Sequence, residues 1–332
     1  MAPAPRIKDV AERAGVSPTL ASFALNGRAG VSPRTRKRIL AAAAELGYSG
    51  NPHARALRTG YGSAFALLIR NLSNPMFLDV IAGAQEAVAG TDATIVVANS
   101  DYDFERERKN IRQLAAQRVG GLAITPVGPG ESLELWREIC PTTPTVLLFS
   151  VAPGMSDLIR IAPDNDAAVR LVVDHLHDLG HREILFLSAP TELMADPDRL
   201  VAFEQRCTEL GVVPRVLGAQ LNVDSIIREI RALLLSDSPP TAVMTNSDYT
   251  AHAVYLAARE CGVRVGQDLS VVGHDDLSTA SLLWPPLTTI KLDVRAIGAA
   301  IIPRLRGIET SDHIEPVELI IRDSTAPPPP RR

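Results

Sequence analysis

From Ala64 to Ile321 the chain alternates short apolar runs with segments of helical periodicity, and this alternation limits the possible folds more than any other feature. Short apolar runs bounded by turn residues predict buried strands, whereas apolar residues at i, i+3, i+4 and i+7 predict amphipathic helices. The expected strands are Ala64–Ile69, Ala93–Ala98, Leu122–Thr125, Thr145–Phe149, Ile184–Ser188, Ala242–Thr245, Ser270–Gly273 and Val317–Ile321. The expected helices lie near residues 76–89, 104–118, 164–179, 197–210, 224–235, 248–261 and 294–306. This order predicts an α/β fold with doubly wound parallel sheets and right-handed crossovers.

Residues 1–50 have a different pattern, which begins with a short helix. Ile7, Val10, Ala11 and Ala14 form its apolar stripe, and Gly15 supplies the turn that ends it. A helix, a glycine turn and a second helix make the helix-turn-helix pattern, whose second helix enters the major groove of DNA. The alternative is a small helical domain with a solvated basic face.

The second helix is expected to run from Pro18 to about Leu25, because Ser17 is a suitable N-cap and proline suits the first helical position. Its small apolar residues, Ala21 and Ala24, face the first helix. The opposite face carries Thr19, Ser22, Phe23 and Asn26. These side chains are therefore the candidates for contacts with DNA bases.

A third helix follows, capped by Ser32 and begun by Pro33. Residues 1–60 carry ten Lys and Arg against three Asp and Glu, whereas the whole chain has a net charge of −4. A basic head on an acidic body suits phosphate binding by the head alone.

The stretch from Ile7 to Leu57 resembles the lactose-repressor/galactose-repressor (LacI/GalR) family of bacterial regulators. The motifs DVAERAGVS, ALNG, VSPRTRKRILAAAAELGY and NPHARALRTG occur in the family's order. The body carries further family motifs, DHLHDLGHREILFLS, LSVVGHDD, PPLTTIKLD and LIIRDSTAPP. The resemblance thus covers nearly the whole chain.

The resemblance implies a two-lobed, periplasmic-binding-protein-like (type I) core behind the helix-turn-helix head. We expect the head at residues 1–50, a hinge helix and linker at 51–62, and an effector-binding and dimerisation domain at 63–325. The chain is expected to cross between lobes near residues 162, 290 and 320, and residues 326–332 are expected to form a disordered tail.

The hinge is expected to be a helix of about two turns, capped by Asn51 and stopped by Gly60. Isolated helices this short are marginal in water, so it is expected to order against DNA. The resemblance implies that Leu57 wedges open a minor-groove base step with Ala54 packed beside it, and the alternative is an ordinary apolar linker residue. The complete set of expected DNA contacts is Ser17, Pro18, Thr19, Ser22, Phe23, Asn26, Arg34, Thr35, Asn51, His53, Ala54 and Leu57.

Polar residues at the carboxyl ends of the strands are the candidates for ligand contacts, because open α/β sheets bind ligands there. The candidate effector-binding residues are Arg70, Ser73, Asn74, Phe77, Thr125, Ser150, Arg199, Ser247, Asp275 and Trp284. Carboxylates, amides and guanidinium groups can each hold two hydroxyls, which suits a sugar. The resemblance makes Arg199 and Asp275 the leading contacts. The alternatives are an ion-paired helix start for Arg199, a turn cap for Asp275 and simple packing for Trp284.

Together these features predict a cytoplasmic transcriptional regulator, most often a repressor in this family, whose operator affinity is controlled by a small molecule. The expected partners are a pseudo-palindromic DNA operator, a carbohydrate effector and a second copy of the chain, since no leucine-heptad tail for tetramers is present. No membrane partner, cofactor, metal or catalytic residue is expected, because Walker, metal-spacing and nucleophile-elbow motifs are absent from the sequence. The rival interpretations are a regulator that has lost its effector response, a pure sugar-binding protein and an enzyme.

One departure from the family pattern concerns DNA specificity. The family often has a Thr-Val-Ser-Arg run in the recognition helix, where this chain has Leu20, Ala21, Ser22 and Phe23. Arginine to guanine is the commonest specific base contact, and a phenylalanine meets a thymine methyl instead. The sequence therefore predicts an operator that differs from the usual half-site at this position.

Overall fold

The computed structural model describes residues 5–25, 29–48, 63–151, 154–190, 193, 197–220 and 222–330. These residues divide into two compact units, Met1–Gly62 and Ser63–Arg332, which are described separately.

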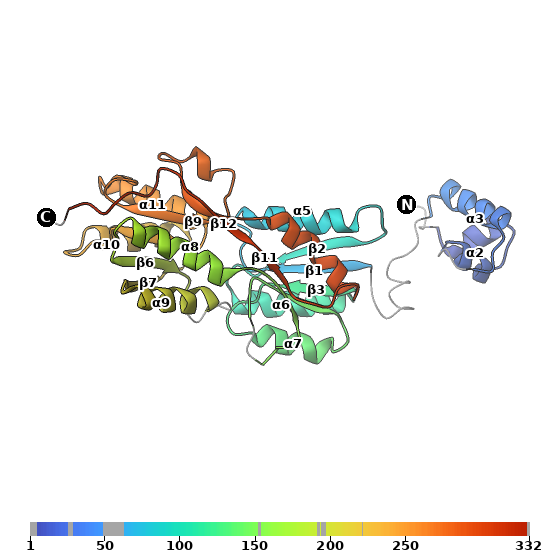
Figure 1. Cartoon of the computed structure of the whole chain (residues 1–332). Coiled ribbons are helices and arrows are strands. Elements are labelled where there is room, and N and C mark those ends of the chain that lie inside the picture. The colour runs from blue at the N-terminus through green and yellow to red at the C-terminus, as the bar shows by residue number, and fades with distance from the viewer. Residues whose placement is uncertain are drawn as a thin grey trace. The chain divides into compact units, whose positions relative to one another are not determined.

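The first unit contains the three predicted helices, α1 (Ile7–Arg13), α2 (Pro18–Leu25) and α3 (Pro33–Glu45) (Figure 1). The turn between α1 and α2 contains Gly15 with a φ of 59°, a left-handed conformation that favours glycine. Ser17 Oγ accepts a hydrogen bond from the Leu20 amide at 3.2 Å, which confirms the predicted cap.

A small core rich in alanine holds the three helices together. Its buried members are Val10, Ala11, Ala14, Ala21, Ala24, Ile39, Ala42 and Ala43. Short side chains allow helices to approach closely, but they bury little apolar area, so each larger residue contributes much of the stability.

In its described residues, the second unit contains two six-stranded sheets that are parallel except for the antiparallel pair β10 and β12. The first sheet has the order β11-β5-β4-β3-β1-β2, and its strands are β1 (Ala64–Ile69), β2 (Thr94–Asn99), β3 (Gly121–Ile124), β4 (Thr145–Leu148), β5 (Ile159–Pro163) and β11 (His313–Glu315). The second has the order β12-β10-β9-β8-β6-β7, and its strands are β6 (Glu183–Ser188), β7 (Val213–Gly218), β8 (Ala242–Thr245), β9 (Ser270–His274), β10 (Thr288–Leu292) and β12 (Val317–Ile320).

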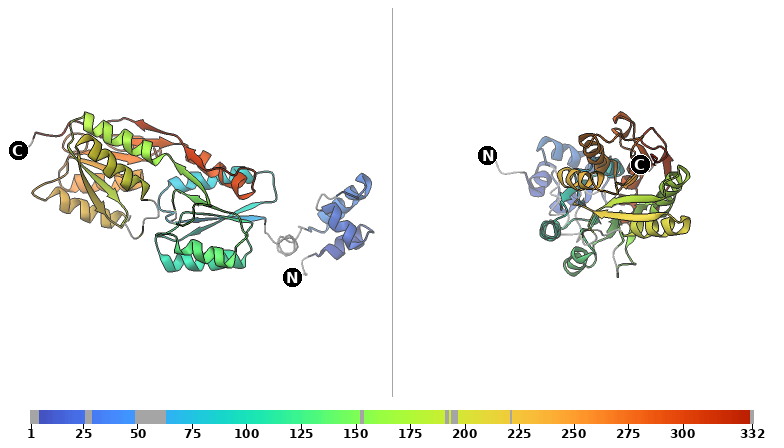
Figure 2. Two further views of the ribbon diagram at one scale, coloured as in Figure 1. Left: turned by 60° about the horizontal axis from the view of Figure 1, so that its bottom comes forward. Right: turned by 90° about the vertical axis from the view of Figure 1, so that its left-hand side faces the viewer.

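Helices cover both faces of each sheet (Figures 1 and 2). The helices of this unit are α5 (Met76–Val88), α6 (Phe104–Ala116), α7 (Glu131–Ile139), α8 (Asn165–Asp178), α9 (Asp198–Leu210), α10 (Val223–Leu234), α11 (Asp248–Glu260), α12 (Val294–Ala299) and α13 (Ile301–Leu305). On β1, Leu67 packs toward α5, α12 and α13, whereas its neighbours Ala66 and Leu68 pack toward α6 and α7. On β6, Leu185 packs with α10 and α11, whereas Phe186 packs with α8 and α9. This alternation produces two three-layered lobes and confirms the predicted doubly wound α/β fold.

The chain passes between the lobes three times. It leaves the first sheet after Pro163, returns to the first lobe after Leu292 in β10, and leaves β11 for β12 at Pro316. The predicted single helix over 294–306 is instead two helices, α12 and α13, that meet at Ala300. Pro303 has no amide hydrogen to donate to the carbonyl four residues earlier, which explains this break.

The prediction of a disordered tail from residue 326 is wrong for its first residues. The Ala326 amide donates to Ser270 Oγ at 3.0 Å, and the Ala326 carbonyl accepts from the same hydroxyl. His181 Nε2 lies 3.0 Å from that carbonyl, so the buried polar groups of the second lobe hold this part of the tail.

Candidate functional site

The exposed start of α2 is the first candidate site. Ser17, Pro18 and Thr19 are exposed, whereas Ser22 and Phe23 are half-buried. Ala21 and Ala24, on the other face of the helix, are buried against the rest of the head, as predicted. Half-buried and exposed side chains along one face of a second helix provide the surface that a helix-turn-helix head presents to DNA bases.

Basic residues accompany this surface at the start of α3. Arg34, Lys37 and Arg38 are exposed there. Thr35 is half-buried, and its amide donates to the capping Ser32 Oγ at 3.2 Å, so it also has a structural role. The predicted contacts Asn26, Asn51, His53, Ala54 and Leu57 lie outside the described residues.

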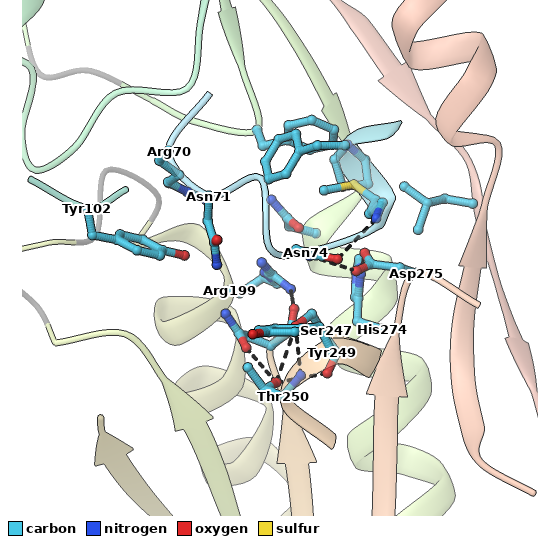
Figure 3. Close-up of a pocket in the computed structure, with 17 residues that line it drawn as sticks. Arg70, Asn71, Asn74, Tyr102, Arg199, Ser247, Tyr249, Thr250, His274 and Asp275 are labelled. Carbon is cyan, nitrogen blue, oxygen red and sulfur yellow. Dashed lines mark hydrogen bonds and ion pairs between the residues drawn. The ribbon is translucent and has the colours of Figure 1, made fainter. Parts of the chain in front are cut away.

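The second candidate site is a cleft between the lobes of the second unit (Figure 3). It encloses about 610 Å³ of space free of atoms, its open mouth included. The cleft is lined by Arg70, Asn71, Asn74, Met76, Phe77, Tyr102, Phe149, Pro163, Asn165, Arg199, Asn246, Ser247, Tyr249, Thr250, His274, Asp275 and Leu292. Most of these residues follow the carboxyl ends of strands, where this class of sheet binds ligands.

Six of the ten predicted effector contacts line this cleft, and they are Arg70, Asn74, Phe77, Arg199, Ser247 and Asp275. The other four do not line it. Thr125 and Ser150 are fully buried, Ser73 is exposed, and Trp284 is 90% exposed beside a different surface groove that Tyr255 also lines.

Asp275 connects the two lobes across the cleft. Its Oδ2 accepts a long, 3.4 Å hydrogen bond from Asn74 Nδ2, which belongs to the first lobe. Its Oδ1 lies 2.9 Å from His274 Nδ1, and its own amide donates to the Ile290 carbonyl at 2.8 Å. Asp275 has a φ of 110°, so these contacts hold the carboxylate in a backbone conformation that non-glycine residues rarely adopt.

Asp248 lies directly beneath this loop and is fully buried. Its Oδ1 accepts a hydrogen bond from Thr289 Oγ1 at 2.6 Å, and its Oδ2 accepts one from the Leu277 amide at 2.8 Å. A Cβ at Gly273 would lie 2.0 Å from Asp248 Oδ1, so only glycine leaves room for this carboxyl. Burial raises the pKa of Asp248 well above its ordinary value, and the charge of Asp275 raises it further.

The raised pKa of Asp248 predicts a pH dependence of stability. The bound proton stabilises the fold fully below the pH at which an unfolded aspartate ionises, about 3.9, and this contribution is lost as the pH rises through the folded-state pKa. We expect the free energy of unfolding in urea to fall as the pH rises from about 3.9 toward the raised folded-state pKa, and Asp248→Asn to reduce that fall. The slope from one proton is at most about 1.4 kcal/mol per pH unit.

The exposed Asp237 provides the matched control for this measurement, since Asp237→Asn changes the same functional group on the surface. Subtraction of the variant curve from the wild-type curve removes contributions from other carboxyls. Equal pH dependence in the wild type and Asp248→Asn would contradict the assignment.

Several of the remaining cleft residues were missed in the sequence for identifiable reasons. Tyr102 follows β2 in a left-handed conformation with a φ of 56°, and Asn165 follows β5, a strand the sequence did not reveal. Asn246, Tyr249 and Thr250 surround the predicted Ser247 at the start of α11. The rule that ligands bind at strand carboxyl ends would have found Asn246, since it follows β8 directly.

Arg199 and Tyr102 determine much of the electrostatics of the cleft. Arg199 Nη1 donates to the Asn246 carbonyl at 2.9 Å, which fixes the start of α9 against the end of β8. Burial raises the pKa of the Tyr102 hydroxyl, whereas the positive charges of Arg70 and Arg199 lower it. Both guanidinium groups therefore act on the Tyr102 hydroxyl.

Among the described residues, no helix combines the length and apolar character required to span a membrane. No group of three or more His, Cys, Asp and Glu within that part of the chain is arranged to hold a metal ion.

A helix-turn-helix head and a two-lobed unit with a polar cleft define the class of DNA-binding regulators that carry a small-molecule-binding fold. Residues 6–51 match the family model for bacterial regulatory proteins of the lacI family, and residues 173–325 match the periplasmic binding protein-like domain. The chain belongs to the LacI family of bacterial transcriptional regulators.

Individual relatives agree with this assignment. The chain is 31% identical over 301 residues to the HTH-type transcriptional repressor PurR of Edwardsiella ictaluri, covering 88% of this chain and 87% of the relative. PurR of Photobacterium profundum is 28% identical over 328 residues, covering 96% and 98% of the two chains. The solved Lac repressor dimer bound to operator and the anti-inducer ONPF matches with a TM-score of 0.82 at 28% identity, covering 98% of this chain and all of the repressor chain.

Proposed function

We propose that this protein is a homodimeric transcriptional repressor whose affinity for a pseudo-palindromic operator is controlled by a sugar-like effector bound between its lobes. The observation that carries the proposal is the exposed face of α2 in a basic three-helix head, joined in one chain to a unit with a polar cleft. The solved Lac repressor dimer bound to an operator supports the DNA-binding part of the proposal.

Contacts that cross the cleft support control by a ligand. Arg160 of β5 forms an ion pair with Asp198, the first residue of α9, and Arg199 is the next residue in that helix. A ligand that contacts Arg199 and the Asn74–Asp275 pair would favour one lobe arrangement over another. An effector changes operator affinity only by binding the two states differently, and such contacts provide that difference.

Exposed apolar residues on the second lobe support a dimer. Leu282 is 79% exposed and Trp284 is 90% exposed, and both line a groove with Tyr255 and Leu256. Large apolar side chains grouped in this way indicate a protein interface. Two copies related by a twofold axis would present two heads to two half-sites.

Selection of bound DNA from a random pool by the full chain, with and without a metabolite panel, tests the proposal. We expect a symmetric pair of half-sites and at least one metabolite that changes operator affinity fivefold or more, roughly the lower limit of typical allosteric coupling. Recovery of no preferred sequence, or turnover of a panel sugar, would refute it.

Phe23 leads to a separate prediction about base preference. Phe23→Arg is expected to create a guanine preference at one position of each half-site, worth roughly 1–3 kcal/mol, because arginine can bond guanine O6 and N7. Selection with this variant and with Phe23→Leu, which removes the ring without adding a donor, measures the change. An identical base preference in the wild type and Phe23→Arg would show that residue 23 does not contact bases.

A further inference from the structure

The charges in the cleft are unequally distributed. Among the residues that the structure describes, its lining contains two guanidinium groups, Arg70 and Arg199, and one carboxylate, Asp275. Figure 3 shows Asp275 beside His274 and Asn74 on one side, with Arg70, Asn71 and Tyr102 grouped on the other. His274 and Asn74 already contact the Asp275 carboxylate.

Arg70 has no carboxylate ion-pair partner among the residues that the structure describes. Asp101, which follows β2, pairs with Arg106 at 3.1 Å. Glu107 is buried near Arg70, but its oxygens accept hydrogen bonds from the Val127 amide and the Ser132 hydroxyl. Burial also raises the pKa of Glu107, so its carboxyl is less fully ionised and balances less of the positive charge of Arg70. A half-buried guanidinium that faces a cleft without a carboxylate partner favours an anionic ligand.

The two arginines come from opposite lobes. Arg70 follows β1 of the first sheet, and Arg199 begins α9 of the second lobe. An anion that accepts hydrogen bonds from both would connect the two lobes. Asn71, Asn74 and Asp275 would remain available to the hydroxyls of the same ligand.

We infer that the effector is an anionic sugar derivative, a hydroxylated molecule whose carboxylate or phosphate lies between Arg70 and Arg199. This inference rests on the proposed effector function of the cleft and narrows its ligand class. Arginine can donate two parallel hydrogen bonds to the oxygens of either a carboxylate or a phosphate. The ligand could therefore be a sugar acid or a sugar phosphate, and the experiment must distinguish these two classes.

Titration calorimetry on the full chain tests the inference with hexoses and pentoses, each in neutral, aldonate and phosphorylated form, and with inorganic phosphate at constant ionic strength. We expect at least one anionic form to bind more tightly than its neutral parent and than inorganic phosphate. Arg70→Met and Arg199→Met should each weaken that binding roughly 10- to 100-fold, the loss expected for a charge-assisted hydrogen bond. Arg112→Met, on the exposed face of α6, is the matched control and should leave binding unchanged.

Inorganic phosphate allows a second measurement, one whose result does not depend on the stereochemistry of a sugar. Millimolar phosphate should raise the Tm of the wild type more than that of either cleft variant, since the head is identical in all of them. An equal rise in the wild type and Arg70→Met would overturn the inference, as would tighter binding of a neutral sugar than of its anionic forms. If a neutral ligand alters operator binding, the regulator function stands and the anion inference fails, whereas failure to bind any operator rejects the regulator function itself.

Discussion

Ile39→Ala is expected to abolish operator binding while the two-lobed unit keeps its stability and its ligand affinity. Ile39 is fully buried in a head core whose other buried members are six alanines and Val10. Truncation of a buried isoleucine to alanine typically costs about 2–5 kcal/mol. A domain of about 60 residues is only marginally stable, so a loss of this size unfolds most of the head.

Leu40→Ala is the matched control, because Leu40 is the next residue of α3 and is 48% exposed. Fluorescence anisotropy with labelled operator measures DNA binding, and thermal unfolding resolves the two units if they melt separately. We expect at least a tenfold loss of operator affinity for Ile39→Ala and little change for Leu40→Ala. Equal operator affinities for the two variants would mean that the head does not depend on this core.

The sequence predicted well where local pattern and tertiary environment agree. Strand β1 lies at Ala64–Ile69 as predicted, because it is paired on both sides, with β2 and β3, and apolar on both faces. The strand β7 was missed because Pro214 and Arg215 interrupt its apolar run. It lies at the edge of the second sheet, where a proline need not donate to a neighbouring strand.

Other elements depend on contacts that periodicity does not reveal. Strand β11 has three residues and pairs only with β5, whose own run contains Arg160. Helix α7 was also missed, although Trp136 is buried on it and donates from Nε1 to Thr145 Oγ1 at 2.9 Å. Short elements of this kind are specified by their neighbours in the fold more than by their own sequence.

The cleft residues likewise differ in whether local sequence or the surrounding fold determines their positions. Arg199 and Asp275 were placed in it from motif positions, and both line it. Trp284 was chosen for its ring, but its position depends on the loop before β10, which directs it to an exposed groove. Tyr102 was missed because its place in the cleft depends on a left-handed backbone, which single-sequence patterns do not encode.

The contact between α5 and α12 leads to the second large prediction. Gly83 and Gly298 lie where these helices approach most closely: a Cβ at Gly298 would lie 2.2 Å from the Val80 carbonyl oxygen, and one at Gly83 would lie 2.2 Å from the Arg295 carbonyl oxygen. Helix α12 follows the interlobe strand β10, whose last residue, Leu292, lines the cleft. The glycine contact therefore anchors the returning chain to the first lobe.

Gly298→Val is expected to force these helices apart and to destabilise the two-lobed unit by at least about 1–3 kcal/mol, the usual cost of overpacking a core. The cost should exceed that of Ala299→Val, a matched control on the exposed face of the same helix. Urea denaturation measures the stability of both variants, and calorimetry measures their affinity for a ligand of the cleft.

Arg295 also pairs with Glu86 of α5 at 2.8 Å. A displaced α12 loses this ion pair and shifts Leu292, so ligand affinity should fall together with stability. Equal stability of the two variants would show that α5 and α12 can separate without cost. Strands β11 and β12 alone would then have to hold the returning chain in place.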